Sequence, residues 1–233
     1  MLFQPWDELL HQYVSDRGLV DYQAWKQSTQ KLTDWLEELS HVDPEQLSTD
    51  WQLALWLNLY NALTIKQILN RYPIKSILPK FLGIPNWLAF FAFFSLPTYT
   101  LNHQRYSLSK IEHDILRQQY SEPQIHFALV CASIGCPLLR NEAYSGDRVR
   151  IQLDDDAKRF INNPDKVYYD TKQELLYCSK IFKWYGKDFL KVANSIPEYI
   201  QGYLTLDITL DASTPIEYLD YDWSLNQQRS HSN

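Results

Sequence analysis

The sequence predicts an α+β fold in which helices pack around a small antiparallel sheet. Several segments repeat apolar residues three and four positions apart, which is the spacing of a helix with one buried face. Two shorter regions alternate apolar and polar residues on either side of a turn, as β-hairpins do. The length of 233 residues suits one domain with a full-sized core. We therefore expect a single domain over residues 1–226 and a polar C-terminal tail over 227–233.

The strongest helical pattern lies over residues 48–72. Ser48 or Thr49 can cap its first turn, and Pro73 stops the helix because a residue before proline avoids the helical conformation. The segment is apolar on nearly every face, which predicts a central, buried helix. The same spacing predicts shorter helices over 6–14, 21–40, 110–120 (with Ser109 as its cap), 149–162, 181–193 and 197–204.

Alternating patterns predict the strands. Residues 98–102 and 105–109 form one expected hairpin, and residues 166–179 contain a second. The apolar run IHFALVC over 125–131 is expected to be a buried strand.

The segment LGIPNWLAFFAFFSL over 82–96 is rich in large apolar side chains. It is shorter than the about 20 apolar residues that a membrane-spanning helix needs, and Pro85 and Asn86 interrupt it. We expect no membrane span. The segment is predicted to be buried or covered by a partner, and it could mediate a homodimer.

Composition and charge exclude several classes of function. A net charge of −6 argues against a nucleic-acid partner, and no glycine-rich phosphate-binding loop is present. The N-terminus lacks the pattern of a secretion signal, and three cysteines do not make a disulfide framework. We therefore expect a cytoplasmic protein with reduced thiols, and we expect no cofactor.

The stretch HFALVCASIGCP over 126–137 carries two of the three cysteines. Cys131 ends the predicted strand, and the small residues after it leave room for a substrate and for backbone N–H groups that can bind an oxyanion. A buried core thiol, a disulfide with Cys136 and a metal site remain alternatives. The spacing of the cysteines is poor for zinc, so no metal is expected. Cys178 is expected to be structural.

A thiol with a pKa of about 8.5 needs a base to act as a nucleophile near neutral pH. His113 lies in the first turn of the helix predicted over 110–120, next to Glu112. His126 is close to Cys131 in sequence but points to the opposite face of the predicted strand, so it is not expected to serve Cys131.

Asn58 and Asn61 are unusual on an apolar helix, because a buried amide without hydrogen bonds is costly. They are expected to brace backbone groups close to the site, or to tie the helix to a loop.

These motifs together resemble the family called domain of unknown function 547 (DUF547). The resemblance rests on WLNLYNALTIKQIL (56–69), YSLSKIEHDILR (106–117), IHFALVCASIGCPLLRNEAY (125–144) and IEYLDYDWSLN (216–226), with VDYQAW (20–25) and IFKWYGKDF (181–189) in support. Its motif positions correspond here to Asn58, Asn61, Glu112, His113, Cys131 and Cys136, and residues 82–96 look like a local elaboration. The family is similar to papain-like and transglutaminase-like cysteine enzymes with a rearranged chain order, and the resemblance implies a reactive Glu, His and Cys.

The expected function is that of a cysteine-dependent amide hydrolase or acyl-transfer enzyme. Cys131 is the expected nucleophile, with Cys136 as the alternative, and His113 is the expected base, supported by Glu112. Backbone N–H groups, with Asn58 or Asn61, are expected to hold the oxyanion. A small peptide or thiol peptide such as glutathione is the expected substrate. The alternatives are a catalytically silent binding or dimerisation module and a redox sensor that uses a disulfide between the two cysteines.

Overall fold

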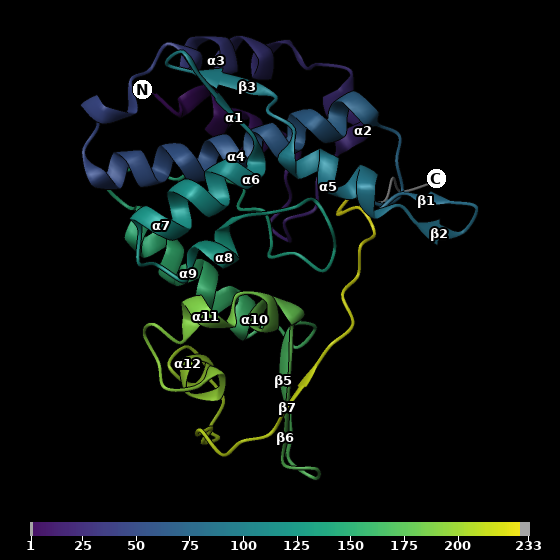
Figure 1. The fold of residues 1–233 in the computed structure, drawn as a ribbon, viewed down its shortest axis with the longest axis vertical. Coiled ribbons are helices and arrows are strands. Elements are labelled where there is room, and N and C mark those ends of the chain that lie inside the picture. The colour runs from purple at the N-terminus through teal and green to yellow at the C-terminus, as the bar shows by residue number, and fades with distance from the viewer. Residues whose placement is uncertain (1, 229–233) are drawn as a thin grey trace.

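The computed structural model describes residues 2–228 and confirms a mixture of helices with small sheets (Figure 1). The helices are α1 (Gln4–Tyr13), α2 (Tyr22–Lys26), α3 (Gln30–Ser40), a 3-10 turn (Pro44–Gln46), α4 (Thr49–Arg71), α5 (Trp87–Ser95), α6 (Leu108–Lys110), a π-helical segment (Ile111–Leu116), α7 (Arg117–Gln119), α8 (Ile125–Ala128), α9 (Val149–Ile161), α10 (Lys180–Trp184), α11 (Gly186–Phe189) and α12 (Ile196–Gln201). The strands are β1 (Lys80–Phe81), β2 (Ile84–Pro85), β3 (Tyr99–Leu101), β4 (Gln104–Tyr106), β5 (Val167–Asp170), β6 (Leu175–Cys178) and β7 (Ile216–Tyr218).

Helix α4 is the centre of the larger hydrophobic core, as the sequence predicts. Every side chain from Leu53 to Ile65 is buried, and α2, α6, α9 and the π-helical segment pack against the helix. A helix that is apolar all round can be stable only when neighbours cover every face. Here the surrounding helices supply that cover.

Several predicted helices differ in detail from the structure. The segment 21–40 forms two helices, because α2 ends at Lys26 and α3 starts at Gln30, and 181–193 is divided into α10 and α11. The helix predicted over 110–120 starts two residues earlier. Its cap is Ser107, whose hydroxyl accepts a hydrogen bond from the backbone N–H of Lys110, and not Ser109.

The predicted strand over 125–131 is wrong. Residues Ile125–Ala128 form the helical turn α8, in which the Leu129 N–H donates to the Ile125 carbonyl at 3.0 Å. A short apolar run is compatible with either a buried strand or a buried helix, and periodicity alone does not separate them. The alternation of side chains that a strand would impose is therefore lost at His126.

Both predicted hairpins are present, as β3–β4 and β5–β6. However, β7 adds to β6 in parallel, so the largest sheet is mixed and not antiparallel. This sheet lies with α10–α12 at one end of the molecule (Figure 1). The expectation that helices enclose the sheet is therefore wrong, because most of them pack around α4 instead.

After β7 the chain returns along the side of the molecule to the helical body (Figure 1). The Leu225 N–H donates to the Lys75 carbonyl, and the Asn226 N–H donates to the Ala132 carbonyl. The Gln228 N–H donates to Val20, so ordered pairing continues past residue 226, where the tail was expected to begin. Residues 229–233 of the expected tail lie outside the described residues.

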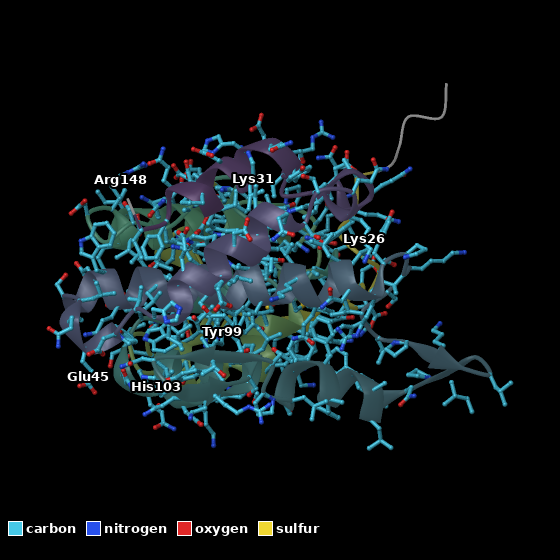
Figure 2. The ribbon with its side chains drawn as sticks, turned by 90° about the horizontal axis from the view of Figure 1, so that it is seen from above. Lys26, Lys31, Glu45, Tyr99, His103 and Arg148 are labelled. Carbon is cyan, nitrogen blue, oxygen red and sulfur yellow. A yellow bond between two sulfur atoms is a disulfide. The ribbon has the colours of Figure 1, made fainter. Side chains whose placement is uncertain are left out.

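The apolar segment 82–96 forms one strand of the short β1–β2 hairpin and then α5. The hairpin projects beyond the helical body in both views (Figures 1 and 2). Only Phe93 of α5 is buried, so the expectation of burial fails for most of this helix. None of the helices in the described part of the chain is both long enough and apolar enough to cross a bilayer.

Candidate active site

A cavity of about 420 Å³ lies between α5, the π-helical segment and α10. It brings together Glu112, His113, Cys131 and Cys136, which the sequence places in separate motifs. Its volume falls within the range of roughly 300–1,000 Å³ that is typical of small-molecule sites. The other lining residues are Tyr60, Trp87, Phe90, Phe91, Phe94, Ser95, Ser109, His126, Leu129, Pro137, Ile181, Trp184, Tyr185, Tyr221 and Trp223.

Cys131 and Cys136 are joined by a disulfide bond in the structure. The sequence left this pairing open as one of several alternatives. A disulfide sulfur has no thiolate, so Cys131 can act as a nucleophile only after reduction. Cys178 is free and buried, and burial raises the pKa of its thiol to about 12. This environment agrees with a structural thiol.

The loop that contains the disulfide is held in a constrained conformation. Ala132 has a φ of 64°, in the left-handed region that side chains other than glycine disfavour. Gly135 lies so close to Tyr221 that a Cβ atom would approach its ring to 2.8 Å. Such backbone conformations persist where the surrounding structure enforces them, and they concentrate at functional sites. The returning C-terminal segment enforces this one.

Asn58 and Asn61 brace backbone and do not line the cavity. The Asn61 amide donates to the Ala128 carbonyl and accepts from the Val130 N–H, both at 3.0 Å. Asn58 makes the equivalent pair of bonds with the backbone of Tyr144. Asn61 therefore fixes the segment that leads directly into Cys131. Both residues therefore bind backbone, and neither amide lines the cavity in which an oxyanion would form.

Glu112 lies in the π-helical segment, a type of helix distortion that is frequent at functional sites. Its carboxylate accepts hydrogen bonds from Tyr185 at 2.6 Å and from Tyr60 at 3.3 Å. Burial is the main cause that raises the pKa of both phenols, so they remain protonated donors. The nearest distance from Glu112 to the His113 ring nitrogen Nδ1 is 4.0 Å, which is too long for a hydrogen bond. Glu112 therefore does not orient His113 directly here.

His113 has a side chain that is 44% exposed, and it is engaged with Arg117. The guanidinium Nη1 lies 3.0 Å from Nδ1 of His113. Because a guanidinium can only donate, Nδ1 accepts and the proton of the neutral ring is on Nε2. In this arrangement the accepting nitrogen of His113 is already used.

His126 is the second histidine of the cavity, and the sequence reasoning set it aside. Its Nε2 lies 2.9 Å from the carboxylate of Asp188, and its ring stacks on Tyr185 with centroids 3.9 Å apart. A carboxylate at Nε2 assigns the ring proton to that nitrogen and leaves Nδ1 as the acceptor. Burial lowers the pKa of His126, against an opposing effect of Asp188. The bonds from His126 and Arg117 hold the pKa of Asp188 well below its usual range.

Two hydroxyl groups surround the sulfurs. Ser133 Oγ lies 3.2 Å from the Cys131 sulfur, and the Tyr221 hydroxyl lies 3.4 Å from Cys131 and 3.2 Å from Cys136. Burial raises the pKa of Tyr221, so its phenol is a protonated donor toward sulfur. Ser133 and Tyr221 were not identified from sequence. The segment YLDYDW over 218–223, rich in aromatic and acidic residues, was the available signal for Tyr221.

The chain was compared with known families, curated proteins and solved structures. A family model described as protein of unknown function, DUF547, matches residues 44–161, which contain both cysteines of the disulfide and the Glu112–His113 pair. The match leaves out the motif at 216–226 and the two supporting motifs at 20–25 and 181–189. No curated protein and no solved structure matches the chain. The match covers half of the sequence and includes the central motifs, and the chain therefore belongs to the DUF547 family.

Proposed function

We propose that the protein is a cysteine-dependent amide hydrolase or acyl-transfer enzyme with reduced Cys131 as its nucleophile. The observation that carries this proposal is the convergence of Cys131 and two histidines on one cavity of ligand size. The likeness to papain-like and transglutaminase-like enzymes that the family resemblance implies supports the same chemistry. A reducing compartment such as the cytoplasm would keep the nucleophile available.

In the proposed reaction, a thiol reductant first supplies two electrons and two protons to the disulfide. A neutral histidine then takes the proton of the Cys131 thiol, and the thiolate attacks the carbonyl carbon of an acyl compound. The C–N bond breaks as the amine leaves with that proton from the imidazolium. The resulting thioester is released to water or to another nucleophile. Ser133 and Tyr221 lie close enough to the sulfur to donate hydrogen bonds to the thiolate before it attacks.

Two histidines are candidates for the base. The family resemblance implies His113, with Glu112 adding negative charge nearby. The hydrogen bonds favour His126, because Asp188 orients its ring and leaves Nδ1 able to accept a proton, whereas Arg117 occupies Nδ1 of His113. We therefore propose His126 with Asp188 as the base, and His113 with Glu112 as the alternative pair.

The test is alkylation of the reduced protein with iodoacetamide from pH 5 to 9, followed by mapping of the modified cysteines. We expect Cys131 to react well below pH 8 and faster than Cys136 or Cys178. His126→Ala should move the profile toward an ordinary thiol with a pKa of about 8.5. The same shift in His113→Ala instead would assign the base to the family's histidine, and Glu112→Gln should then give a smaller shift. Equal, slow labelling of all three cysteines would contradict the proposed enzyme.

A reversible redox switch is the second candidate, and the Cys131–Cys136 disulfide is the observation that favours it. Formation of this bond removes the nucleophile and releases two electrons and two protons to an oxidant such as a disulfide or peroxide. Titration of the disulfide against glutathione buffers, read by mass spectrometry, tests this role. A midpoint close to the poise of the cytoplasm would support a switch, and one far below it would indicate a structural bond.

A further inference from the structure

We propose that the cavity binds an uncharged ligand with an elongated apolar acyl group, whose carbonyl end lies at Cys131. This inference deepens the proposed function and rests on it for the role of Cys131. It concerns the class of substrate, and it differs from the anionic thiol peptide that the sequence suggested.

The shape of the cavity lining favours an elongated ligand. An unbroken series of aromatic rings leads from α5 to the sulfurs. Phe90 of α5 meets Trp223 edge to face at 5.0 Å, and Trp223 meets Tyr221 at 4.4 Å. The hydroxyl of Tyr221 then contacts both sulfurs. A ligand that lies along these rings has its far end at Cys131, which suits an acyl chain with a terminal carbonyl.

The charge of the cavity lining favours an uncharged ligand. In the described part of the chain, no lysine or arginine lines the cavity, and Glu112 places one carboxylate in its wall. The neighbouring guanidinium of Arg117 is paired with Asp188 at 2.6 Å. A carboxylate on the ligand would lose its hydration and face Glu112, with no lysine or arginine in the described lining to pair with it. The polar groups that do line the site are suited to a neutral carbonyl or amide.

Helix α5 places partly exposed apolar side chains in the cavity wall. Apolar side chains on one face of it line the cavity, including Phe90 and Phe91. These side chains keep part of their surface open: Phe93 is the buried residue of the helix, and Phe91 is 59% exposed. Large apolar groups that stay partly in contact with water release free energy when a ligand covers them. The helix therefore joins the core through Phe93 and supplies a wall of the binding cavity through its open apolar face.

The experiment uses the full chain in its disulfide form, in which Cys131 cannot react, so binding is measured apart from catalysis. Octanamide, octanoate, acetamide and glutathione are titrated by isothermal calorimetry and by tryptophan fluorescence. We expect octanamide to bind more than about tenfold tighter than octanoate, because like charges repel in a desolvated site, and far tighter than acetamide or glutathione. The proposal would be overturned if octanoate or glutathione bound as tightly as octanamide. It would also be overturned if octanamide did not bind.

Variants on α5 and at Glu112 sharpen the test. Phe90→Ala should weaken octanamide binding by about tenfold, and the more exposed Phe91→Ala by a smaller factor, because each removes apolar contact. Leu88→Ala is the matched control, since Leu88 is 84% exposed and does not line the cavity. Glu112→Gln should tighten octanoate binding alone. Equal loss in Leu88→Ala and Phe90→Ala would show adsorption on the outer surface and would overturn the cavity assignment. Rapid labelling of Cys131 in the reduced protein would leave the proposed function standing in either case.

Discussion

Helices α4 and α5 are both apolar on nearly every face, yet α4 is enclosed and α5 is largely open to solvent. The side chains of α4 from Leu53 to Ile65 are all buried, whereas Phe93 is the buried residue of α5. Neighbouring helices cover α4, and α5 packs mainly against α6 while its other face borders the cavity. Apolar composition alone therefore does not decide burial. An apolar helix that the fold leaves uncovered indicates where a ligand or partner can bind.

Truncation of one leucine in each helix should show the largest contrast. Leu57→Ala on α4 is expected to lower the free energy of unfolding by about 2–5 kcal/mol, because Leu57 is fully buried and its loss leaves a cavity. Leu88→Ala on α5 should change it by less than about 0.5 kcal/mol. Urea unfolding followed by tryptophan fluorescence measures both. A similar cost at the two positions would contradict the contrast.

Asparagines provide a second pair. Asn61→Ala should destabilise by about 2–4 kcal/mol, because it leaves the buried Ala128 carbonyl and Val130 N–H without partners. Asn86 accepts one bond from the Ala89 N–H at the exposed start of α5, so Asn86→Ala should cost about 1 kcal/mol. The same urea experiment measures both losses of unfolding free energy, and the loss should be larger for Asn61→Ala than for Asn86→Ala. Asn86→Ala as the costlier change would show that α5 matters more to stability than its exposure indicates.

Reduction of the disulfide tests how much the loop from Cys131 to Cys136 contributes to stability. Asn61 of α4 binds the backbone just before this loop. The bond closes a short loop with a sequence separation of 5. Constraint of the unfolded chain by a loop of this size is worth roughly 2 kcal/mol. Unfolding with and without a phosphine reductant measures the loss. A Cys131→Ser/Cys136→Ser variant is the control and should not respond to the reductant.

Sequence reasoning located the elements whose pattern was long and unambiguous. Helix α4 begins and ends within one residue of the expected bounds, because a run of this length can only be a helix that neighbours enclose. The short run 125–131 was ambiguous, and its assignment as a strand turned His126 away from the cavity. Tertiary packing, not local periodicity, selected the helical turn α8.

The site was predictable where its residues lie in compact motifs and not where distant segments meet. Glu112, His113 and Cys131 do line one cavity. Asp188 lies 62 positions from the histidine it contacts, and Tyr221 lies 90 positions from Cys131. No spacing rule links such residues, because their contact depends on how α11 and the C-terminal segment pack against the rest of the chain.

Acylation of reduced Cys131 would show whether this residue is a nucleophile toward acyl groups. The reduced protein is incubated with p-nitrophenyl octanoate, and the intact mass and the modified peptide are determined. We predict that one octanoyl group forms on Cys131 as p-nitrophenolate leaves. This acylation should be faster than acetylation by p-nitrophenyl acetate. It should be absent from the disulfide form and from Cys131→Ser. An unmodified Cys131 with no release of p-nitrophenolate, or equal modification of the disulfide form, would contradict it.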